Sequence, residues 1–331
     1  KLEGGLPDPS PGSPSACRLE VEKPGNLLES LMGQIHIQEE ISMASPVVLS
    51  PEPGERVLDL CAAPGSKTTQ IAMMMENRGL LVANDPANTR VASLRSNCER
   101  AGAVNVAVTR YDGRRFPDRG FDRVLVDAPC TGQGMARKDI TVLGRWSLKR
   151  SLGIQRLQRA LLRRALQVQG PGDGVYSTCT FAPEENEGVV SWALGQVSGV
   201  RLQEASVRGL AGSPGLAEWA GSRFGDEMEL CTRYYPHQND AGGFFVAKLI
   251  KNRSPLQPMD RATVAEIMGS RFGIPPEAFE GVSFFLRGRN VWAFSLPEIP
   301  DLAWETVGLR FISVRGRVPK PTTTALQLFG P

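Results

Sequence analysis

Two of the six cysteines in this 331-residue sequence stand in short turns rather than in apolar runs. Cys130 lies in a DAPCTG run, and Cys179 lies in an STCT run. A lone buried cysteine is usually only a small hydrophobic side chain, which is how we interpret Cys98 and Cys231. Core packing does not require a cysteine in a polar turn. The sequence therefore favours reactive thiols at Cys130 and Cys179.

The spacing of the cysteines does not indicate structural disulfide bonds. A dithiol redox pair is an alternative, but the six cysteines are scattered and form no C-x-x-C pair. We interpret the two histidines, His36 and His237, as structural and expect no metal site. A chain of this length can bury a core without disulfide bonds. We therefore expect a reducing, cytoplasmic environment in which cysteine chemistry is catalytic.

A loop of small residues follows the first predicted strand and leads into a helix-like stretch. Such a loop lets the backbone approach a ligand closely, as in dinucleotide, nucleoside triphosphate or S-adenosylmethionine sites. The G-x-G-x-x-G pattern of dehydrogenases is absent. A phosphate loop is also a poor match, because a serine separates the glycine from the lysine. The residues of this loop are Cys61, Ala62, Ala63, Pro64, Gly65, Ser66 and Lys67.

Acidic residues recur at the ends of four successive predicted strands: Asp59, Asp85, Asp112 and Asp127. The carboxyl ends of strands line the ligand site of an open α/β sheet. A single aspartate there is more often a turn or cap residue. Four in register favour a ligand shaped like a nucleoside, with ribose hydroxyls and an amino group to bind.

Short β-like runs alternate with helical ones from about residue 25 to 250, which predicts a parallel sheet with helices on both faces. Residues 1–24 are rich in Pro, Gly and Ser and are expected to form a flexible tail. We expect one large domain at 25–252 and a small α+β unit at 255–331. The predicted strands are 56–60, 80–84, 105–109, 123–127, 174–178, 230–235 and 243–249, followed by 282–286 and 291–294 in the last unit.

Basic residues concentrate between Arg137 and Arg164, where nine of them accompany one acid. This window carries +8 in a chain of net charge +3, which favours a polyanionic partner over a merely solvated helix face. Apolar spacing predicts a helix over 154–168, with Arg156, Arg159 and Arg163 on its polar face. No apolar run approaches the roughly 20 residues of a membrane span, and we expect no membrane partner.

Three segments with these turns resemble the SUN family of RNA (cytosine-5)-methyltransferases: residues 59–72, 124–139 and 176–190. Residues 36–49 and 233–249 are also similar, so the resemblance runs from about 25 to 250. The APCTGQGMARKD and TFAPEENEGVV variants look most like the bacterial RsmF-type enzymes that act on 16S ribosomal RNA. Thr131 stands where the family usually has serine, which keeps the hydroxyl.

The resemblance implies a Rossmann-like S-adenosylmethionine methyltransferase sheet followed by a PUA-like RNA-binding domain. It implies that Cys179 adds to carbon 6 of cytosine and that Cys130 assists product release. Asp127 is expected to pair with the cytosine amino group and ring nitrogen, and Lys67 to orient the base or cofactor. The implied S-adenosylmethionine contacts are Cys61, Ala62, Ala63, Pro64, Gly65, Ser66, Lys67, Asp85, Arg90, Asp112 and Asp127.

Several alternatives remain open at this point. The substrate could be transfer RNA instead of ribosomal RNA, or DNA, although the PUA-like end argues against DNA. The chain could also be a non-catalytic RNA-binding or ribosome-assembly factor, although such a scaffold has no need of both thiols. We expect a monomer. We also expect a helix to begin at Pro183, so that its positive end favours a thiolate at Cys179.

Overall fold

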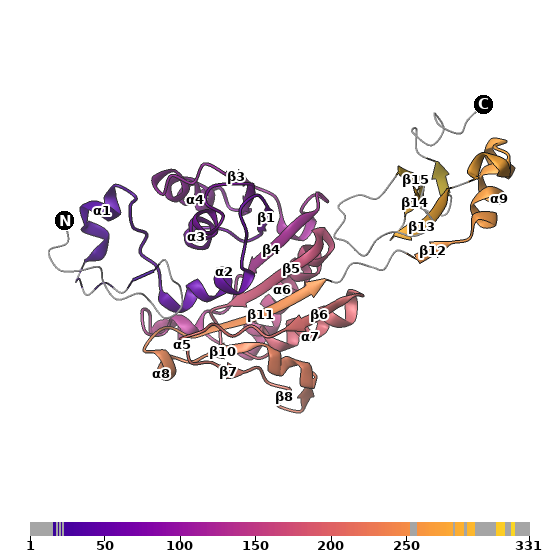
Figure 1. Cartoon of the computed structure of the whole chain (residues 1–331). Coiled ribbons are helices and arrows are strands. Elements are labelled where there is room, and N and C mark those ends of the chain that lie inside the picture. The colour runs from indigo at the N-terminus through magenta and orange to yellow at the C-terminus, as the bar shows by residue number, and fades with distance from the viewer. Residues whose placement is uncertain are drawn as a thin grey trace. The chain divides into compact units, whose positions relative to one another are not determined.

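The computed structural model describes residues 16–17, 19, 21, 23–251, 257–280, 282–287, 290–294, 309–314 and 319–321. The chain divides into two compact units, residues 1–252 and 253–331 (Figure 1). The expected tail, residues 1–24, lies almost wholly outside the described residues. Within the described residues, no helix is long and apolar enough to cross a membrane.

The described residues of the first unit contain a nine-stranded sheet in the order β3-β2-β1-β4-β5-β11-β10-β7, with β6 beside β11. The strands from β3 to β5 are parallel, and those beyond β5 are antiparallel. This confirms the predicted Rossmann-like α/β sheet. The strands are β1 (Arg56–Asp59), β2 (Leu80–Asn84), β3 (Val106–Thr109), β4 (Phe121–Asp127), β5 (Gln169–Thr178), β6 (Val200–Gln203), β7 (Ser213–Pro214), β10 (Thr232–Tyr234) and β11 (Phe244–Lys251), with a separate hairpin of β8 (Glu218–Trp219) and β9 (Ser222–Arg223).

The predicted strands of this unit all occur, but β5 begins five residues earlier than expected. Its first residues, QGPG, have the composition of a turn. In the sheet Gln169 nevertheless pairs with Phe121, and an irregularity in the ladder accommodates the residues between this pair and the next. The sequence prediction missed β6, which extends the ladder of β11.

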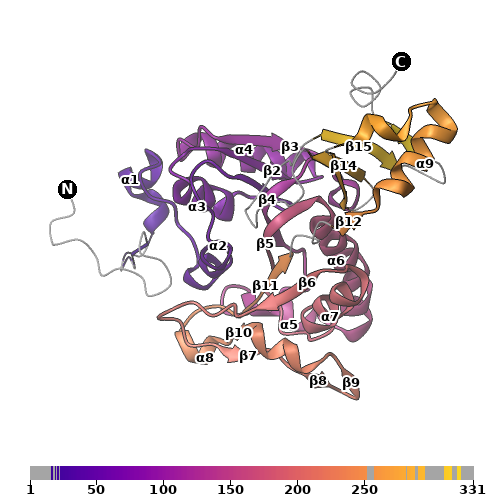
Figure 2. The ribbon, with the colours of Figure 1, turned by 45° about the vertical axis from the view of Figure 1, so that its right-hand side comes forward.

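Helices cover both faces of the sheet (Figure 2). Residues that alternate along the strands pack in two hydrophobic clusters. One cluster joins β4 and β5 to α6 and α7, and the other joins β1 and β4 to α2 and α3. The helices are α1 (Leu28–Leu31), α2 (Ala44–Leu49), α3 (Ser66–Met74), α4 (Asn88–Arg100), α5 (Thr141–Gly144), α6 (Leu148–Val168), α7 (Glu187–Gln196) and α8 (Pro236–Asn239).

The long helix α6 begins six residues before the predicted start. The side chain of Ser147 accepts a hydrogen bond from the backbone N–H of Arg150 and caps the first turn. The apolar periodicity starts only later, because Leu148 and Leu152 near the helix start are exposed. The cap, rather than the hydrophobic pattern, sets this boundary.

Helix α7 begins at Glu187, so the expected start at Pro183 is wrong. The Asn186 side chain accepts a hydrogen bond from the Thr178 hydroxyl at 2.6 Å and donates one to the Thr180 carbonyl at 3.0 Å. These bonds hold the segment from Pro183 as turns. Cys179 therefore does not stand just before a helix, and the helix-dipole argument for its thiolate fails.

The described part of the second unit is α+β, with strands in the order β12-β13-β14-β15-β16. Helix α9 packs its buried Val264 and Met268 with Phe279 and Phe284. The predicted strands 282–286 and 291–294 correspond to β13 and β14. The elements are β12 (Gln257–Met259), α9 (Arg261–Phe272), β13 (Ser283–Arg287), β14 (Asn290–Phe294), β15 (Leu309–Val314) and β16 (Pro319–Pro321).

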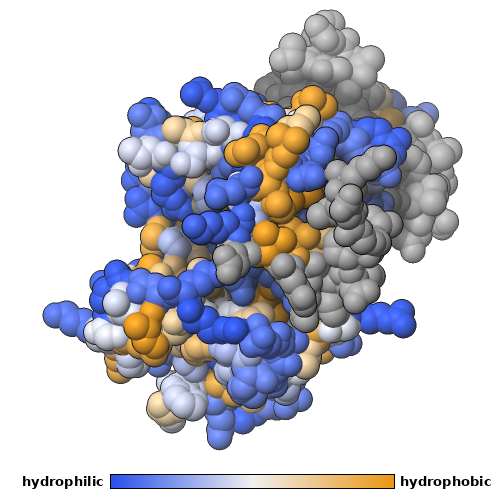
Figure 3. Space-filling view, turned by 90° about the vertical axis from the view of Figure 1, so that its left-hand side faces the viewer, coloured by the Kyte–Doolittle hydropathy of each residue, from blue (hydrophilic) through white to orange (hydrophobic). Residues whose placement is uncertain are grey.

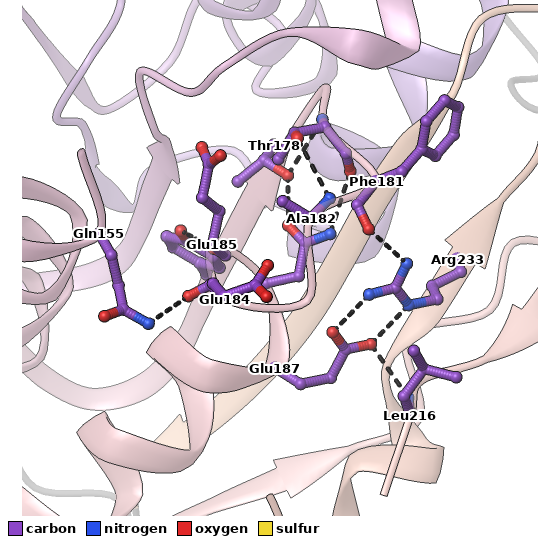
Figure 4. Close-up of polar contacts among 12 residues, drawn as sticks. Gln155, Thr178, Phe181, Ala182, Glu184, Glu185, Glu187, Leu216 and Arg233 are labelled. Atoms are coloured by element: carbon purple, nitrogen blue, oxygen red, sulfur yellow. Dashed lines mark hydrogen bonds and ion pairs between the residues drawn. The ribbon is translucent and has the colours of Figure 1, made fainter. Parts of the chain in front are cut away.

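A buried ion pair ties the start of α7 to β10 (Figure 4). The Glu187 carboxylate accepts two hydrogen bonds from the Arg233 guanidinium, at 2.6 and 2.5 Å. The side chains are only 0% and 4% exposed. Arg233 also donates to the Phe181 carbonyl at 3.1 Å, and the Leu216 N–H donates to Glu187 at 3.0 Å. The pair thereby holds the segment that follows Cys179.

We predict that replacing Arg233 by Met lowers the free energy of unfolding by about 3–5 kcal/mol, because the Glu187 carboxylate stays buried without its cation. Urea unfolding measures the loss. Arg223→Met is the matched control, since its pair with Asp226 is exposed and should contribute less than about 1 kcal/mol. Equal losses in the two variants would contradict the structural role of the buried pair.

Candidate active site

The ends of β1, β4 and β5 bring three of the predicted segments together. The order of the sheet reverses between β1 and β4, and ligands of open α/β sheets bind beyond the carboxyl ends of the strands at such a point. The loop 61–67 follows β1, Cys130 follows β4 and Cys179 follows β5. Figure 3 views the molecule from the side on which these strands end, where hydrophilic residues surround a strip of hydrophobic ones.

The sulfur atoms of Cys130 and Cys179 lie 3.3 Å apart, and both residues are half-buried. A hydrogen bond from Cys130 and the charge of Lys67 lower the pKa of Cys179, although burial and the nearby Asp127 oppose them. The bond to Cys179, burial and the charge of Glu185 raise the pKa of Cys130 well above its ordinary value. These shifts favour the thiolate form at Cys179 and the thiol form at Cys130.

Lys67 and Asp127 form an ion pair beside the thiols, with 2.8 Å between Nζ and Oδ2. The other oxygen of Asp127 accepts a hydrogen bond from the Ser177 hydroxyl at 2.8 Å. Burial alone would lower the pKa of Lys67, but the charge and hydrogen bond of Asp127, together with Cys179, raise it. A cation is therefore fixed next to the sulfur of Cys179.

The two cysteine-bearing loops are bonded to each other through their neighbours. The hydroxyls of Thr131 and Thr180 lie 3.1 Å apart, and both lie within hydrogen-bonding distance of the Gln133 side-chain oxygen. The backbone N–H of Gly134 donates to the Cys179 carbonyl at 2.9 Å. A Cβ at Gly134 would lie only 2.1 Å from the Gly243 carbonyl oxygen, so only glycine permits this approach.

The fully buried carboxylate of Glu185 makes the strongest connection between the loops. It accepts from the hydroxyl of Thr131, and from its backbone N–H at 2.9 Å. Two donors from α6, the Ser151 hydroxyl at 2.8 Å and the Gln158 amide at 3.0 Å, complete the set. The helix expected from Pro183 would place Glu185 in its first turn, exposed near a helix end. The donors to Glu185 come from segments distant in sequence, so no local signal identifies its role.

The predicted cofactor loop is held by polar side chains from outside it. Arg90 donates to the Ala63 carbonyl at 2.5 Å and pairs with the buried Asp85 at 3.1 Å. The His36 ring nitrogen lies 3.0 Å from the Ser66 hydroxyl, and burial followed by the charge of Arg100 lowers the pKa of His36. Arg90, predicted as a cofactor contact, thus also joins the loop to Asp85.

Two further predicted acids, Asp59 and Asp112, and the thiol of Cys61 lie in different environments. Burial raises the pKa of Asp59 to about 7, and one of its oxygens accepts from the Thr68 hydroxyl at 2.7 Å. Burial and the nearby acids raise the pKa of Cys61 well above its ordinary value, so this third thiol is not activated. Asp112 lies at the end of β3, where its carboxylate pairs with Arg114 at 2.7 Å.

The structure divides the basic block into paired and exposed residues. Arg137 pairs with Asp240, Lys138 with Glu39 and Arg145 with Asp139, whereas Arg159 and Arg164 donate to backbone carbonyls. Arg159, expected on the polar face of its helix, is partly buried against Trp192. The exposed cations of α6 are Lys149, Arg150, Arg156 and Arg163.

We predict that iodoacetamide modifies Cys179 faster than the exposed Cys17 at about pH 7, because the thiolate is the reacting species and the Cys179 pKa is lowered. Replacing Lys67 by Met removes the adjacent cation, raises the Cys179 pKa and shifts its reactivity to higher pH. Peptide mass spectrometry across a pH series measures both effects. Faster modification of Cys130 would contradict the assignment of the thiolate.

We predict that replacing Thr131 by Val lowers the free energy of unfolding by about 1–3 kcal/mol, because Glu185 loses a buried donor. Thr131→Ser keeps the hydroxyl and serves as the matched control. Urea unfolding of both variants measures the difference. A serine variant as unstable as the valine variant would show that the methyl group, not the hydroxyl, matters.

Comparisons with known proteins agree with this geometry. Residues 46–250 match the family model of the 16S rRNA methyltransferases RsmB/F. The chain is 43% identical to the tRNA (cytosine(49)-C(5))-methyltransferase of Pyrococcus abyssi over 69% of this chain and 74% of that protein. It is also 43% identical to the ribosomal RNA small subunit methyltransferase F of Shewanella oneidensis, over 71% of this chain and 49% of that protein. The chain therefore spans about half the length of that relative.

Solved structures show the same fold. The crystal structure of NSun6 from Pyrococcus horikoshii with SFG is 35% identical, with a TM-score of 0.61 over 69% of this chain and 56% of that one. A methyltransferase homologue from the same organism is 37% identical, with a TM-score of 0.60 over 69% and 72%. The chain belongs to the RsmB/F family of 16S rRNA methyltransferases.

Proposed function

We propose that this protein methylates carbon 5 of cytosine in RNA, with S-adenosylmethionine as methyl donor and Cys179 as covalent nucleophile. The observation that carries the proposal is the pair of thiols 3.3 Å apart, one with a lowered pKa and the other with a raised pKa. Membership of the RsmB/F family supports methyl transfer to RNA as the reaction that this pair of thiols serves. A non-catalytic scaffold would not need either the pair or its adjacent cation.

The residues beyond β1, β2 and β3 fit S-adenosylmethionine. Their set of acceptors, Asp59, Asp85 and Asp112, suits ribose hydroxyls and amino groups. One oxygen of the buried Asp59 has no partner in the described structure, so an acceptor is left over beside the loop. A related structure contains SFG, an analogue of S-adenosylmethionine. We assign the loop 61–67, Asp85, Arg90, Asp112 and Asp127 to this site; when bound, the cofactor supplies a methyl group on a positively charged sulfur.

Carbon 5 of cytosine is too weak a nucleophile to take this methyl group unaided. The Cys179 thiolate adds to carbon 6 and forms a carbon–sulfur bond, which places an electron pair on carbon 5. Carbon 5 then attacks the methyl group, whose bond to the sulfonium sulfur breaks. Asp127 accepts an N–H from the cytosine amino group, a donor that uracil lacks. Lys67 holds Asp127 in place and stabilises the thiolate.

Release requires two further bond changes. The proton on carbon 5 passes to a solvent water, and the electron pair of its C–H bond forms the double bond to carbon 6 as the bond to Cys179 breaks and its electrons return to the sulfur. Cys130 lies against the Cys179 sulfur, where it can assist this release and return a hydrogen bond to the thiolate. Glu185 positions Cys130 through Thr131 rather than acting on the substrate.

The RNA target must be unpaired or extruded, because a base inside a duplex cannot reach the thiols. The exposed cations of α6 are suited to phosphates. We propose ribosomal RNA as the substrate, following the family. Transfer RNA is the second candidate, because the Pyrococcus abyssi relative is named for it and the chain covers 74% of that protein. We propose the second unit, residues 255–331, as a PUA-like RNA-binding domain.

We predict opposite outcomes for the two cysteines. Cys179→Ala should abolish methyl transfer from labelled S-adenosylmethionine to RNA and form no covalent complex. Cys130→Ala should lose turnover but accumulate a protein–RNA adduct, because addition proceeds and release does not. Gel electrophoresis under denaturing conditions detects the adduct. The exposed Cys17→Ser variant is the control and should behave like the unmodified protein.

Reversed results, with the adduct accumulating in Cys179→Ala, would exchange the two roles. If the unmodified protein binds cofactor but transfers no methyl group to bulk RNA, the non-catalytic alternative is favoured. Bisulfite sequencing of RNA from cells that lack the gene identifies the target nucleotide and separates ribosomal from transfer RNA.

A further inference from the structure

A cavity of about 520 Å³ lies on the outer side of α6 and α7, beneath the β8–β9 hairpin. It is separate from the thiols and from the cofactor loop. Its lining combines aromatic rings with polar side chains of both charges. The lining includes Trp192, Trp219, Arg159, Glu184, Gln155 and Leu148.

Two indole rings belong to this cavity. Trp192 on α7 lies under the guanidinium of Arg159, 5.5 Å from its ring centre. Trp219 on the hairpin is 51% exposed, so one face of its ring is available for stacking. The hairpin turns at Ala220 and Gly221, whose φ angles are 46° and 77°. Such a two-residue turn with two positive φ angles is tight, so it holds Trp219 at a fixed position over the cavity.

Two polar atoms of the lining have no partner among the described residues. They are one carboxylate oxygen of Glu184 and the Nε of Arg159, and both are buried. The Gln155 side-chain amide donates a hydrogen bond to the Glu184 backbone carbonyl at 2.5 Å, so it does not pair with the Glu184 carboxylate. An unpaired buried acceptor and an unpaired buried donor both cost free energy. A ligand edge that carries a donor beside an acceptor would satisfy both.

The cavity lies at the same end of the sheet as the thiols. Helices α6 and α7 both start near the carboxyl ends of the strands, and Leu148 is the first residue of α6. Glu184 follows Cys179 in the same loop. The exposed Lys149 and Arg156 stand on α6 beside the cavity. The pocket and the thiols thus lie toward the same end of the sheet, and Glu184 in the pocket lining follows Cys179 by five residues.

We propose that the cavity binds one unpaired nucleobase of the RNA substrate that flanks the target cytosine. The base would stack on Trp219 and present its edge to Glu184 and Arg159, while Lys149 and Arg156 bind the adjoining phosphates. Base stacking on aromatic side chains is a general mode of binding single-stranded RNA. This assignment rests on the proposed function, since it concerns the same RNA.

The test measures binding of a short, unstructured, fluorescein-labelled single-stranded RNA by anisotropy, at several salt concentrations. Trp219→Ala should weaken binding about tenfold without changing the salt dependence, because it removes a stacking surface and no phosphate contact. Trp219→Phe should restore most of the affinity. Trp146→Ala is the matched control: Trp146 is also exposed, at 41%, but does not line the cavity.

Methyl transfer separates this inference from the proposed function. Trp219→Ala should raise the KM for RNA and leave kcat and S-adenosylmethionine binding unchanged. If the unmodified protein methylates RNA but Trp219→Ala binds RNA as tightly as the unmodified protein, the nucleobase site is overturned. The proposed function then still stands. Equal weakening by Trp146→Ala also overturns it. An unmodified protein that neither binds nor methylates RNA instead overturns the proposed function.

Discussion

The buried carboxylate of Glu185 is the interaction on which the site geometry depends. It gathers two donors from Thr131 and two from α6, so that the Cys130 turn, the Cys179 loop and the helix between β4 and β5 meet at one group. Each donor would cost free energy if left unpaired in the interior. The sulfurs of Cys130 and Cys179 stay 3.3 Å apart because the loops that carry them are bonded together and cannot move independently.

Given that geometry, the surroundings make the two thiols unequal. The hydrogen bond from Cys130, with the charge of Lys67, lowers the pKa of Cys179, whereas the same bond, burial and the charge of Glu185 raise the pKa of Cys130. The proposed reaction needs this inequality, since one sulfur must attack carbon 6 and the other must remain available for release. The ion pair of Lys67 with Asp127 serves both the thiolate and the recognition of cytosine in this account.

The sequence predicted the strand ends well, because apolar runs followed by Asp, Gly and Pro mark where parallel strands stop. That pattern predicted that Cys130 and Cys179 stand at strand ends, and the sheet shows that the two strands, β4 and β5, are neighbours. The start of α7 could not be predicted, because the side chain of Asn186 bonds to Thr178 and Thr180 and replaces a first helical turn. The role of Glu185 was hidden for the same reason: its four donors come from segments distant in sequence, and no local pattern encodes them.

The most direct test of the central claim is to incubate the protein with S-adenosylmethionine and RNA that contains 5-fluorocytidine. Fluorine replaces the hydrogen that must leave carbon 5, so release is blocked after methyl transfer and the adduct persists. The account predicts that mass spectrometry of the digested complex finds the methylated nucleotide attached to Cys179. Attachment to Cys130, or methylation of ordinary RNA with no adduct on the fluorinated one, would contradict it.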